Sequence, residues 1–429
     1  MKRVSRVFLV VLFLFSLAGV SFATNGDNLI GIGPIARSMG GVGIADPQDA
    51  ISAVFANPAA MCFGPYCPGT EVNFGGTLFM PSVSAHVGLP TGPHTSQSAD
   101  SDDKVYAIPA IGLSVPIADR WRFGLAAYGV SGLGVDYRNT SIDQPGFYFG
   151  GNAPLVQGEY TQLQIMKFSP SISYQVNNNL SLGLGVQIDY ANLDLRNGSS
   201  FNYAVGAQVG GIYKISDGIR IGATYVSPQE VDYNNVLRNP ANPQSSANLK
   251  LEQPQQVGIG ISYEPMQDIL LLEVDGKWIN WASATGYNDF DWEDQWVLAI
   301  GAQYKPTKKI ALRVGYNYAN NPVREHNGWN GAFNPATGAP FDIKTVQGLN
   351  FPRYYYETFR IIGFPAIVKQ HATVGVGYEI SNRFALNAGY THAFKETITE
   401  SGTSPEGQPV TLSSSLSENS LEFGLTWRF

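Results

Sequence analysis

Apolar and polar residues alternate along many segments of this chain. The last nine residues, LEFGLTWRF, place five apolar side chains on one face of an extended strand: Leu421, Phe423, Leu425, Trp427 and Phe429. The same two-residue period recurs at 180–190, 310–319 and 373–380. A β-strand turns successive side chains to opposite faces, so each of these segments is predicted to be a strand with one apolar face. No soluble core could cover so many apolar faces, whereas lipid can.

The alternating segments reach about ten residues, which is enough for a tilted strand to cross a bilayer. Short turns alternate with longer connections, as in barrels whose short turns face the periplasm. The sequence therefore predicts an all-β fold, a transmembrane antiparallel β-barrel of about fourteen strands. An even number of strands lets the first and last pair side by side. The expected strands are 70–86, 104–117, 120–138, 157–176, 179–196, 200–216, 218–234, 246–264, 268–285, 289–306, 308–320, 366–380, 382–400 and 409–429.

The first 23 residues have the organisation of a secretory signal peptide. Three cations precede an apolar stretch and a small-x-small cleavage site: Lys2, Arg3, Arg6, Val7–Val20 and Ser21–Ala23. The apolar stretch is shorter than the roughly 20 residues that a membrane-spanning helix needs. We therefore expect the mature chain to be exported and to begin at Thr24.

The composition fits an exported membrane barrel. Removing the three signal-peptide cations changes the formal net charge from −7 to −10, which argues against nucleic acid as a partner. Aromatic residues make up 12% of the chain and charged residues only 14%, yet the mean hydropathy is −0.07. A transmembrane barrel gives such an average because its lipid face is balanced by a polar interior.

The residues that commonly carry chemistry form no recognisable site. The five histidines are scattered, and neither a zinc-binding pattern nor a GxSxG motif is present, so we expect no metal, no cofactor and no enzymatic activity. Cys62 and Cys67 lie in one short Gly-Pro loop. In an oxidising compartment these two thiols are expected to form a small disulfide.

The segment from Asn28 to Met61 resembles the amino-terminal hatch of the FadL/TodX outer-membrane transporters. It contains an ARxMGG stretch at 36–41 and the motif Asn57-Pro58-Ala59. Further blocks resemble the second half of the family's barrel: 252–265, 271–283, 294–318 and 371–390. The resemblance implies a barrel over 69–429 that is plugged by a hatch over 24–68.

The resemblance also implies a function and a location. Members of this family carry long-chain fatty acids or aromatic hydrocarbons across the bacterial cell outer membrane. The ligand enters from outside, the hatch shifts, and the ligand leaves sideways where the third strand kinks inward. Outer-membrane lipid, lipopolysaccharide and the barrel assembly machinery are implied partners, and the terminal Phe429 resembles the assembly signal of such barrels.

The third expected strand carries three clustered glycines: Gly129, Gly132 and Gly134. Glycine permits a kink or a bulge, so these positions are candidates for the lateral exit. The alternative is that the glycines merely make room inside the barrel.

Two regions differ from the family's fatty acid members. Only the short segment 195–201 separates the fifth and sixth strands, so the external groove of those members is not expected. The loop 322–366 is instead long and rich in aromatics, and its Tyr354, Tyr355 and Phe359 are candidate ligand contacts. The alternative is a lid whose aromatics pack only on one another.

Cations on the inner face of the barrel are further candidates for ligand binding. Strand parity places Lys277 and Arg313 there, and either could bind a carboxylate. Two other functions are open at this point: a general aqueous porin and, less favoured, an outer-membrane barrel enzyme. The sequence does not identify the hydrophobic ligand.

Overall fold

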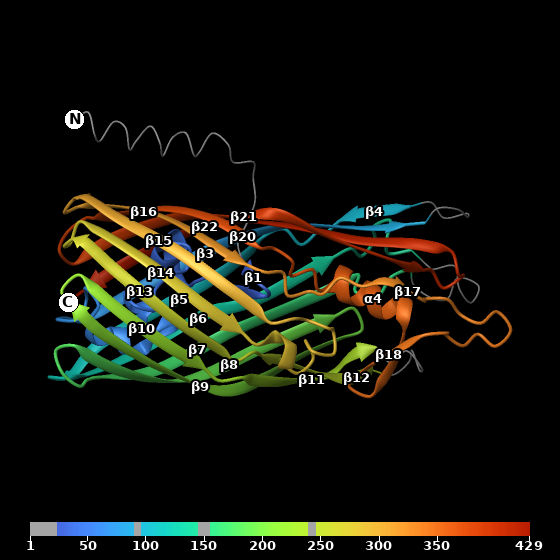
Figure 1. Cartoon of the computed structure of the whole chain (residues 1–429), viewed down its shortest axis with the longest axis horizontal. Helices are drawn as coiled ribbons and strands as arrows, with labels where there is room; N and C mark the ends of the chain where they lie inside the picture. Colours follow the sequence, from blue (N-terminus) through green and yellow to red (C-terminus); the bar gives the residue numbers. More distant parts are fainter. Residues whose placement is uncertain (1–23, 90–95, 145–154, 239–245) are drawn as a thin grey trace, which may run out of the picture.

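The computed structural model describes residues 24–89, 96–144, 155–238 and 246–429, and these form a closed barrel (Figure 1). Each barrel strand pairs antiparallel with the next one, and β22 pairs with β3 to close the ring. The predicted all-β barrel of fourteen strands is therefore confirmed. The barrel strands are β3 (Glu71–Gly88), β5 (Tyr106–Ala118), β6 (Trp121–Asp136), β7 (Tyr160–Gln175), β8 (Leu180–Leu195), β9 (Gly198–Ser216), β10 (Ile219–Val226), β13 (Gln256–Met266), β14 (Leu270–Ile279), β15 (Gln295–Thr307), β16 (Ile310–Ala319), β20 (Gln370–Glu379), β21 (Phe384–Thr403) and β22 (Pro409–Arg428).

The alternation in the sequence becomes an apolar outer face and a polar inner face. In β8, Leu182 and Leu184 are each 50% exposed on the outside, whereas Ser181 and Gln187 are buried inside. Aromatic side chains lie at the ends of strands on the side of the barrel that holds the carboxy terminus. The rings of Trp427 and Phe429, for example, have centroids 4.3 Å apart. Such aromatic girdles mark the edges of the lipid-facing band in transmembrane barrels.

Two of the expected strands are interrupted, which corrects the predicted ranges 218–234 and 246–264. The part of each that is nearer the barrel mouth leaves the barrel ladder. These two parts pair with each other as a separate hairpin of β11 (Gln229–Arg238) and β12 (Ser246–Gln253). Pro228 lies at the first break and Pro254 at the second. Proline has no backbone N–H to donate to a neighbouring strand, so the barrel ladder ends at each of them.

Residues 24–68, which we call the luminal segment, pack inside the barrel (Figure 1). Its elements are β1 (Thr24–Asn25), β2 (Asn28–Leu29), α2 (Gly33–Ser38), α3 (Ala50–Ala56) and the 3-10 helix η1 (Pro58–Cys62). Helix α2 contacts β20, β21 and β22, whereas η1 contacts β7, β8 and β9 on another side of the barrel. The segment therefore bridges distant parts of the wall.

Local sequence determines the turns of the luminal segment. Asp49 caps α3, since its side chain accepts a hydrogen bond of 2.8 Å from the backbone N–H of Ser52. Gly40 and Gly41, of the ARxMGG stretch, have φ angles of +72° and +82°. A Cβ atom at Gly40 would lie 2.7 Å from the carbonyl oxygen of Tyr316 in the wall. The two glycines thus permit both the turn and the close approach of the chain to β16.

The loop 322–366 folds over the mouth of the barrel, at the end opposite the carboxy terminus (Figure 1). Its elements are β17 (Asn327–Trp329), β18 (Ile343–Val346), β19 (Leu349–Pro352) and α4 (Arg353–Gly363). Two smaller elements are β4 (Gln97–Asp100), which extends the sheet beside β3, and η3 (Trp281–Ser283). Among the described helices, none has the length and apolar character to cross a bilayer.

Candidate functional site

The third barrel strand, β6, separates from its neighbour β5 in its upper half. The two strands pair from Ala118 and Trp121 up to Ala110 and Tyr128. Beyond Tyr128, β6 continues to pair with β7 on its other side, with a register shift between Gly129 and Ser131. The upper part of β5 pairs only with β3. The barrel wall therefore has a break in backbone pairing, which we call the lateral gap, beside 129–136.

The clustered glycines occupy this gap. A Cβ atom at Gly129 would clash with the side chain of Ile108, and one at Gly134 would clash with the hydroxyl of Tyr106. A Cβ atom at Gly132 would instead make an ordinary contact, 3.6 Å from the carbonyl oxygen of Leu163. Gly129 and Gly134 thus make room for side chains of β5, whereas a side chain at Gly132 would meet no clash at its Cβ atom.

A small cavity of about 10 Å³ lies where the gap meets the luminal segment. Its lining comes from that segment and from strands β3, β5 and β6, and includes Leu29, Ile32, Thr77, Ile108, Pro109 and Gly129. Most of these side chains are apolar. The wall and the luminal segment therefore meet at the gap around a predominantly apolar space.

The hairpin of β1 and β2, which we call the N-terminal hairpin, lies behind the gap. Asn28 pairs with Ser131, and the backbone N–H of Gly132 donates a hydrogen bond of 3.1 Å to the carbonyl oxygen of Asp27. The hydroxyl of Thr24 donates one of 2.9 Å to Glu418 of β22. Strands β3 and β5 lie between β22 and β6 in the ring, so the hairpin crosses the inner side of the gap.

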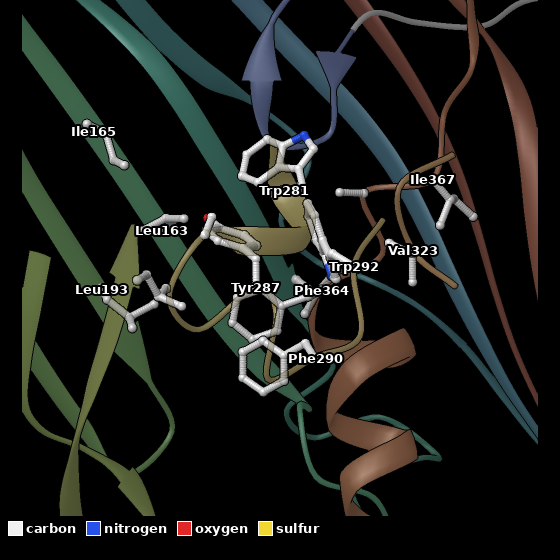
Figure 2. Packing of buried hydrophobic residues seen from close by; sticks show 14 of the residues in the cluster. Leu163, Ile165, Leu193, Trp281, Tyr287, Phe290, Trp292, Val323, Phe364 and Ile367 are labelled. Atoms are coloured by element: carbon white, nitrogen blue, oxygen red, sulfur yellow. The ribbon is translucent and has the colours of Figure 1, made fainter. Parts of the chain in front are cut away.

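The turn of the N-terminal hairpin packs on aromatic side chains of the loop after β14. Trp281 lies against Gly26, with the rings of Tyr287 and Trp292 beside it (Figure 2). The hydroxyl of Tyr287 donates a hydrogen bond to the carboxylate of Asp27. Burial raises the pKa of Asp27 to about 6, although hydrogen bonds from Tyr287 and Ser131 oppose the rise.

The part of the luminal segment that follows the N-terminal hairpin is bound to the wall by charged side chains. Asp275 accepts hydrogen bonds from the backbone N–H groups of Gly43 and Ile44, at 2.9 and 3.1 Å. On another side of the barrel, Arg37 donates one of 2.8 Å to Glu422, and both side chains are fully buried. Charged partners strengthen hydrogen bonds, so these contacts are firm attachments.

The Asn57-Pro58-Ala59 motif supplies a further attachment. The side-chain amide of Asn57 donates to the carbonyl oxygens of Ile44, Gly211 and Ala223, at 2.8, 3.2 and 3.3 Å. Its side-chain oxygen accepts from the N–H of Ala59 at 3.1 Å. One side chain thus joins two parts of the luminal segment to β9 and β10.

Lys277 lines an internal cavity of about 50 Å³ between the luminal segment and the wall. A second lysine and several glutamine side chains share its lining: Lys167, Gln187, Gln208, Gln229, Gln253 and Gln256. Lys167 contacts Gln229 at 2.5 Å and Asp189 at 3.3 Å. The amide-rich lining missed by our sequence reading comes from residues on five strands. Only the pairing register brings them together.

Arg313 lies elsewhere and is occupied. Its guanidinium donates hydrogen bonds to Gln303 and Asn387, at 2.7 and 2.9 Å, and it is not part of the lining around Lys277. The two cations that the sequence placed on the inner face therefore belong to different sites.

The aromatic residues of α4 are buried at the barrel mouth. Tyr354, Tyr355 and Phe359 are only 2%, 7% and 6% exposed. Phe359 packs on Phe290 and Phe364, with ring centroids 5.5 and 5.2 Å away. The rings of Phe290 and Phe364 also stack on each other (Figure 2). The structure brings these three sequence candidates together, but far from Arg313 in a different part of the fold. They form a compact lid with the loop after β14.

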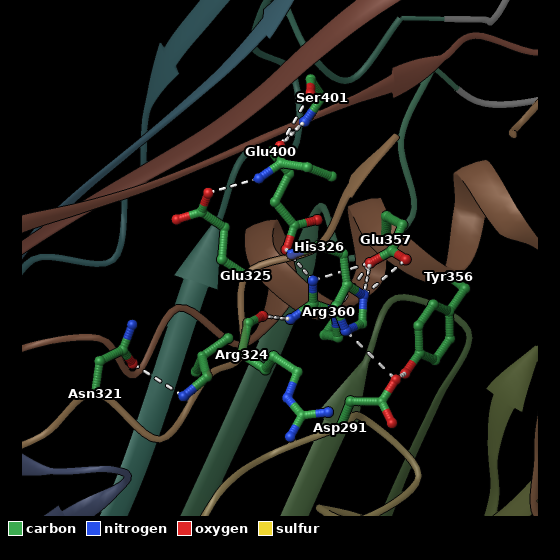
Figure 3. Close-up of polar contacts among 12 residues, drawn as sticks. Asp291, Asn321, Arg324, Glu325, His326, Tyr356, Glu357, Arg360, Glu400 and Ser401 are labelled. Carbon is green, nitrogen blue, oxygen red and sulfur yellow. Dashed lines mark hydrogen bonds and ion pairs between the residues drawn. The ribbon is translucent and has the colours of Figure 1, made fainter. Parts of the chain in front are cut away.

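A buried charge network holds this lid to the barrel (Figure 3). Glu357 contacts Arg360 at 2.9 Å, Arg353 at 2.6 Å and the Nδ1 atom of His326 at 2.9 Å. Arg360 also pairs with Glu400 of β21. Burial alone would raise the pKa of Glu357, but the hydrogen bond with His326 and the charges of Arg360 and Arg353 hold it below its usual value.

The network contains donor types of a metal site. In the part of the chain that the structure describes, His326, Glu357 and Glu400 converge closely enough to hold an ion. Arg360, however, contacts both carboxylates, and Arg353 contacts one of them. Guanidinium groups thus already supply the positive charge that a metal would bring. Sequence reasoning missed this network because its members come from segments far apart in the chain.

The structure differs from the disulfide expected between Cys62 and Cys67. Both are free thiols. The Sγ atom of Cys62 lies 3.3 Å from the hydroxyl of Ser173 in β7, whereas Cys67 points to the carbonyl oxygen of Cys62. The two side chains therefore point in different directions, and a disulfide would require them to turn. Its formation in an oxidising compartment stays a prediction.

A closed fourteen-stranded barrel with an apolar outer face and a filled lumen defines an outer-membrane transport barrel. The chain belongs to the family described as outer membrane protein transport protein (OMPP1/FadL/TodX), whose profile matches residues 20–203 and 199–328. This confirms the family predicted from the segment 28–61. The protein is therefore an outer-membrane transporter and not an enzyme.

Individual relatives agree with this assignment. The long-chain fatty acid transport protein of Escherichia coli (strain K12) is 23% identical, and the alignment covers 97% of this chain and 91% of the relative. Outer membrane protein P1 of Haemophilus influenzae is 21% identical over 76% of this chain and 83% of its own length.

Solved structures share the fold. The toluene transporter TodX of P. putida is 17% identical and matches with a TM-score of 0.63, over 94% of this chain and 99% of that one. The toluene transporter TbuX of Ralstonia pickettii is 18% identical and gives 0.62, with the same coverage.

Proposed function

We propose that this protein transports hydrophobic small molecules, long-chain fatty acids or aromatic hydrocarbons, and releases them sideways through the lateral gap. The observation that carries this proposal is the loss of pairing between β5 and β6 above Tyr128, with the N-terminal hairpin behind it. The substrate classes follow from the relatives, which are transporters of long-chain fatty acids and of toluene.

Lateral release suits a greasy ligand on energetic grounds. Transfer of an apolar chain into water costs about 0.8 kcal/mol for each CH₂ group. Release into the periplasm would require this cost in full, whereas release through the wall keeps the ligand in lipid. The residues that meet between the luminal segment and the gap are mainly apolar, as such a route requires, but the cavity there is only about 10 Å³ and must widen for ligand to pass.

Movement of the luminal segment is part of the proposal, since the N-terminal hairpin covers the gap. The hairpin is held at β22, at β6 and at its turn by Tyr287, whereas the rest of the luminal segment has the Asp275, Arg37 and Asn57 attachments. We therefore assign the motion to the hairpin, with the rest of the hatch as its support.

Other contacts are proposed for the surfaces that face outward. Outer-membrane lipid covers the apolar face of the barrel, and lipopolysaccharide surrounds its outer end. The assembly machinery recognises the last strand, which ends with Trp427 and Phe429. Helix α4 acts as an outer lid that ligand must pass, and its buried aromatics contact the ligand during passage.

The exit route can be tested by filling the gap without disturbing the fold. A Cβ atom at Gly132 would meet Leu163 at an ordinary contact distance, so Gly132→Phe should fold, bind ligand in detergent and lose most uptake in cells. The matched control is Gly276→Phe in β14, where a Cβ atom also has room, 3.9 Å from Ile259. Uptake by Gly132→Phe equal to that of the control would exclude exit at this gap.

A further inference from the structure

We infer that the mature amino terminus is an internal anchor: the α-ammonium group of Thr24 pairs with the carboxylate of Glu418. The pair fastens the N-terminal hairpin at its β22 end. Thr24 becomes the amino terminus through the predicted cleavage after Ala23. The meaning of the pair for the gap rests on the proposed function, but the pair itself can be measured without any transport assay.

Burial places the start of the predicted mature chain in the barrel lumen. Thr24 is 2% exposed and Glu418 is 3% exposed. The Thr24 hydroxyl donates to Glu418 Oε1 at 2.9 Å. The backbone nitrogen of Thr24 is three bonds from that hydroxyl oxygen, so it is held close to the same carboxylate. The imidazole of His371 in β20 also lies beside the Thr24 backbone.

Cleavage changes the chemistry of that nitrogen. Hydrolysis of the peptide bond between Ala23 and Thr24 consumes one water, leaves a carboxylate on Ala23 and gives Thr24 an amine that takes up a proton. A free α-amino group has a pKa of about 7.7–8.0, so it is largely an ammonium at neutral pH. A buried ammonium is stable only with an anionic partner.

The inner face of β22 offers suitable anions at regular spacing. Glu418, Ser420 and Glu422 alternate along this face, and all are buried. Arg37 contacts Ser420 at 2.6 Å and Glu422 at 2.8 Å. Glu418, the next carboxylate along the face, is the one that Thr24 reaches. The luminal segment would thus bind β22 through two cations, one a side chain and one the chain end.

The position of this pair gives it a role at the gap. The N-terminal hairpin crosses from Glu418 on β22 to Ser131 on β6 and passes behind the gap. To uncover the gap, the hairpin must release one of its two ends. The end at β6 is held by backbone pairing and by Asp27, and the end at β22 by Thr24. Signal-peptide removal would therefore complete the fastening of the hairpin.

The test measures the reactivity of the amino terminus in the intact, folded protein. An amine-selective acylating reagent is applied near pH 7, and labelling of Thr24 is followed by mass spectrometry, with the exposed Lys308 and Lys309 as internal standards. Glu418→Gln keeps the shape and a hydrogen-bond acceptor but removes the charge. If the ion pair raises the pKa of the α-amino group by one unit, the free-amine fraction near pH 7 falls about tenfold. Thr24 should then be labelled about tenfold faster in Glu418→Gln than in the native protein.

Two further variants make the result specific. Glu418→Asp keeps the charge at a greater distance and should label at an intermediate rate. Glu396→Gln, which removes a partly exposed carboxylate on β21, should label like the native protein. Heat-modifiability on gels verifies folding of each variant.

The outcomes separate this inference from the proposed function. Equal labelling of the native protein and Glu418→Gln, or a mature terminus other than Thr24, would overturn the ion pair. Faster labelling of Glu418→Gln together with normal uptake by Gly132→Phe would retain the pair and reject the lateral exit.

Discussion

At the scale of single residues, Asp27 fastens the turn of the N-terminal hairpin, and its contribution to stability depends on pH because its carboxyl group is buried. Its side chain is 1% exposed, and burial raises its pKa from 3.8 to about 6. The folded protein thus holds the proton more tightly than the unfolded chain does. Stability from this group is therefore full below about pH 4 and falls as the pH rises toward 6.

Asp27→Asn should remove this pH dependence. The amide oxygen can still accept the hydrogen bond from Tyr287, and no buried charge forms. Between pH 4 and pH 7, the free energy needed to open the hairpin should rise by about 3 kcal/mol in the variant relative to the native protein. Hydrogen exchange of the Gly132 N–H, corrected for intrinsic rates, measures this gain. Asp217→Asn, whose side chain is 86% exposed, is the control, and parallel pH profiles for both variants would refute the expectation.

Single residues also show where sequence reasoning succeeds and where it ends. The motif Asn57-Pro58-Ala59 and the glycines of ARxMGG could be singled out, and each has a structural reason in a wall contact or a positive φ angle. Strand parity correctly placed Lys277 and Arg313 on the inner face. It could not show that they belong to different sites, because that depends on the register of strands far apart in the chain.

At the scale of elements, the barrel strands were predictable because two-residue alternation is a local signal. The break between β10 and β11 was not predicted, although Pro228 and Pro254 were visible. Prolines also occur within paired barrel strands here, as Pro170 does in β7, so a proline alone does not identify a break. Helix α4 was expected only as part of a loop, because its buried face is defined by the barrel mouth.

The lid should depend on its buried charge network. Glu357→Gln leaves Arg353 and Arg360 with less compensating charge, and breaking a buried pair costs about 3–5 kcal/mol. We expect faster proteolysis within 322–366 and unchanged barrel heat-modifiability. The exposed Glu325→Gln in the same loop should have no effect.

The pH dependence of the native lid is a second test of the role of the Glu357 charge. The pKa of Glu357 is held below its ordinary value of 4.5, so its contribution is complete above that pH and is lost only as the pH falls further. Titration of Glu357 should therefore cause no change in the protease resistance of the native lid between pH 8 and pH 5. A lid that already opens within this range would show that other groups control it.

At the scale of the whole molecule, closure of the ring and filling of the lumen decide what can pass. Closure followed from the even number of amphipathic strands, which the sequence predicted. The filling could be inferred only from the resemblance to a family, because a segment without alternation does not by itself indicate where it packs. The structure places that segment against strands on several sides of the barrel.

A filled lumen distinguishes this transporter from a general aqueous porin in planar bilayers. The luminal segment packs inside the ring and is attached by hydrogen bonds to β9, β14 and β22, so it occupies space that an open porin leaves to water and ions. We expect the purified protein to show little steady ion current. A variant lacking residues 24–61 that still shows heat-modifiable folding should conduct strongly, because it keeps the ring and loses the filling. Steady porin-like steps from the native protein would mean that the luminal segment leaves the barrel spontaneously, and the proposed sideways route would then be unnecessary.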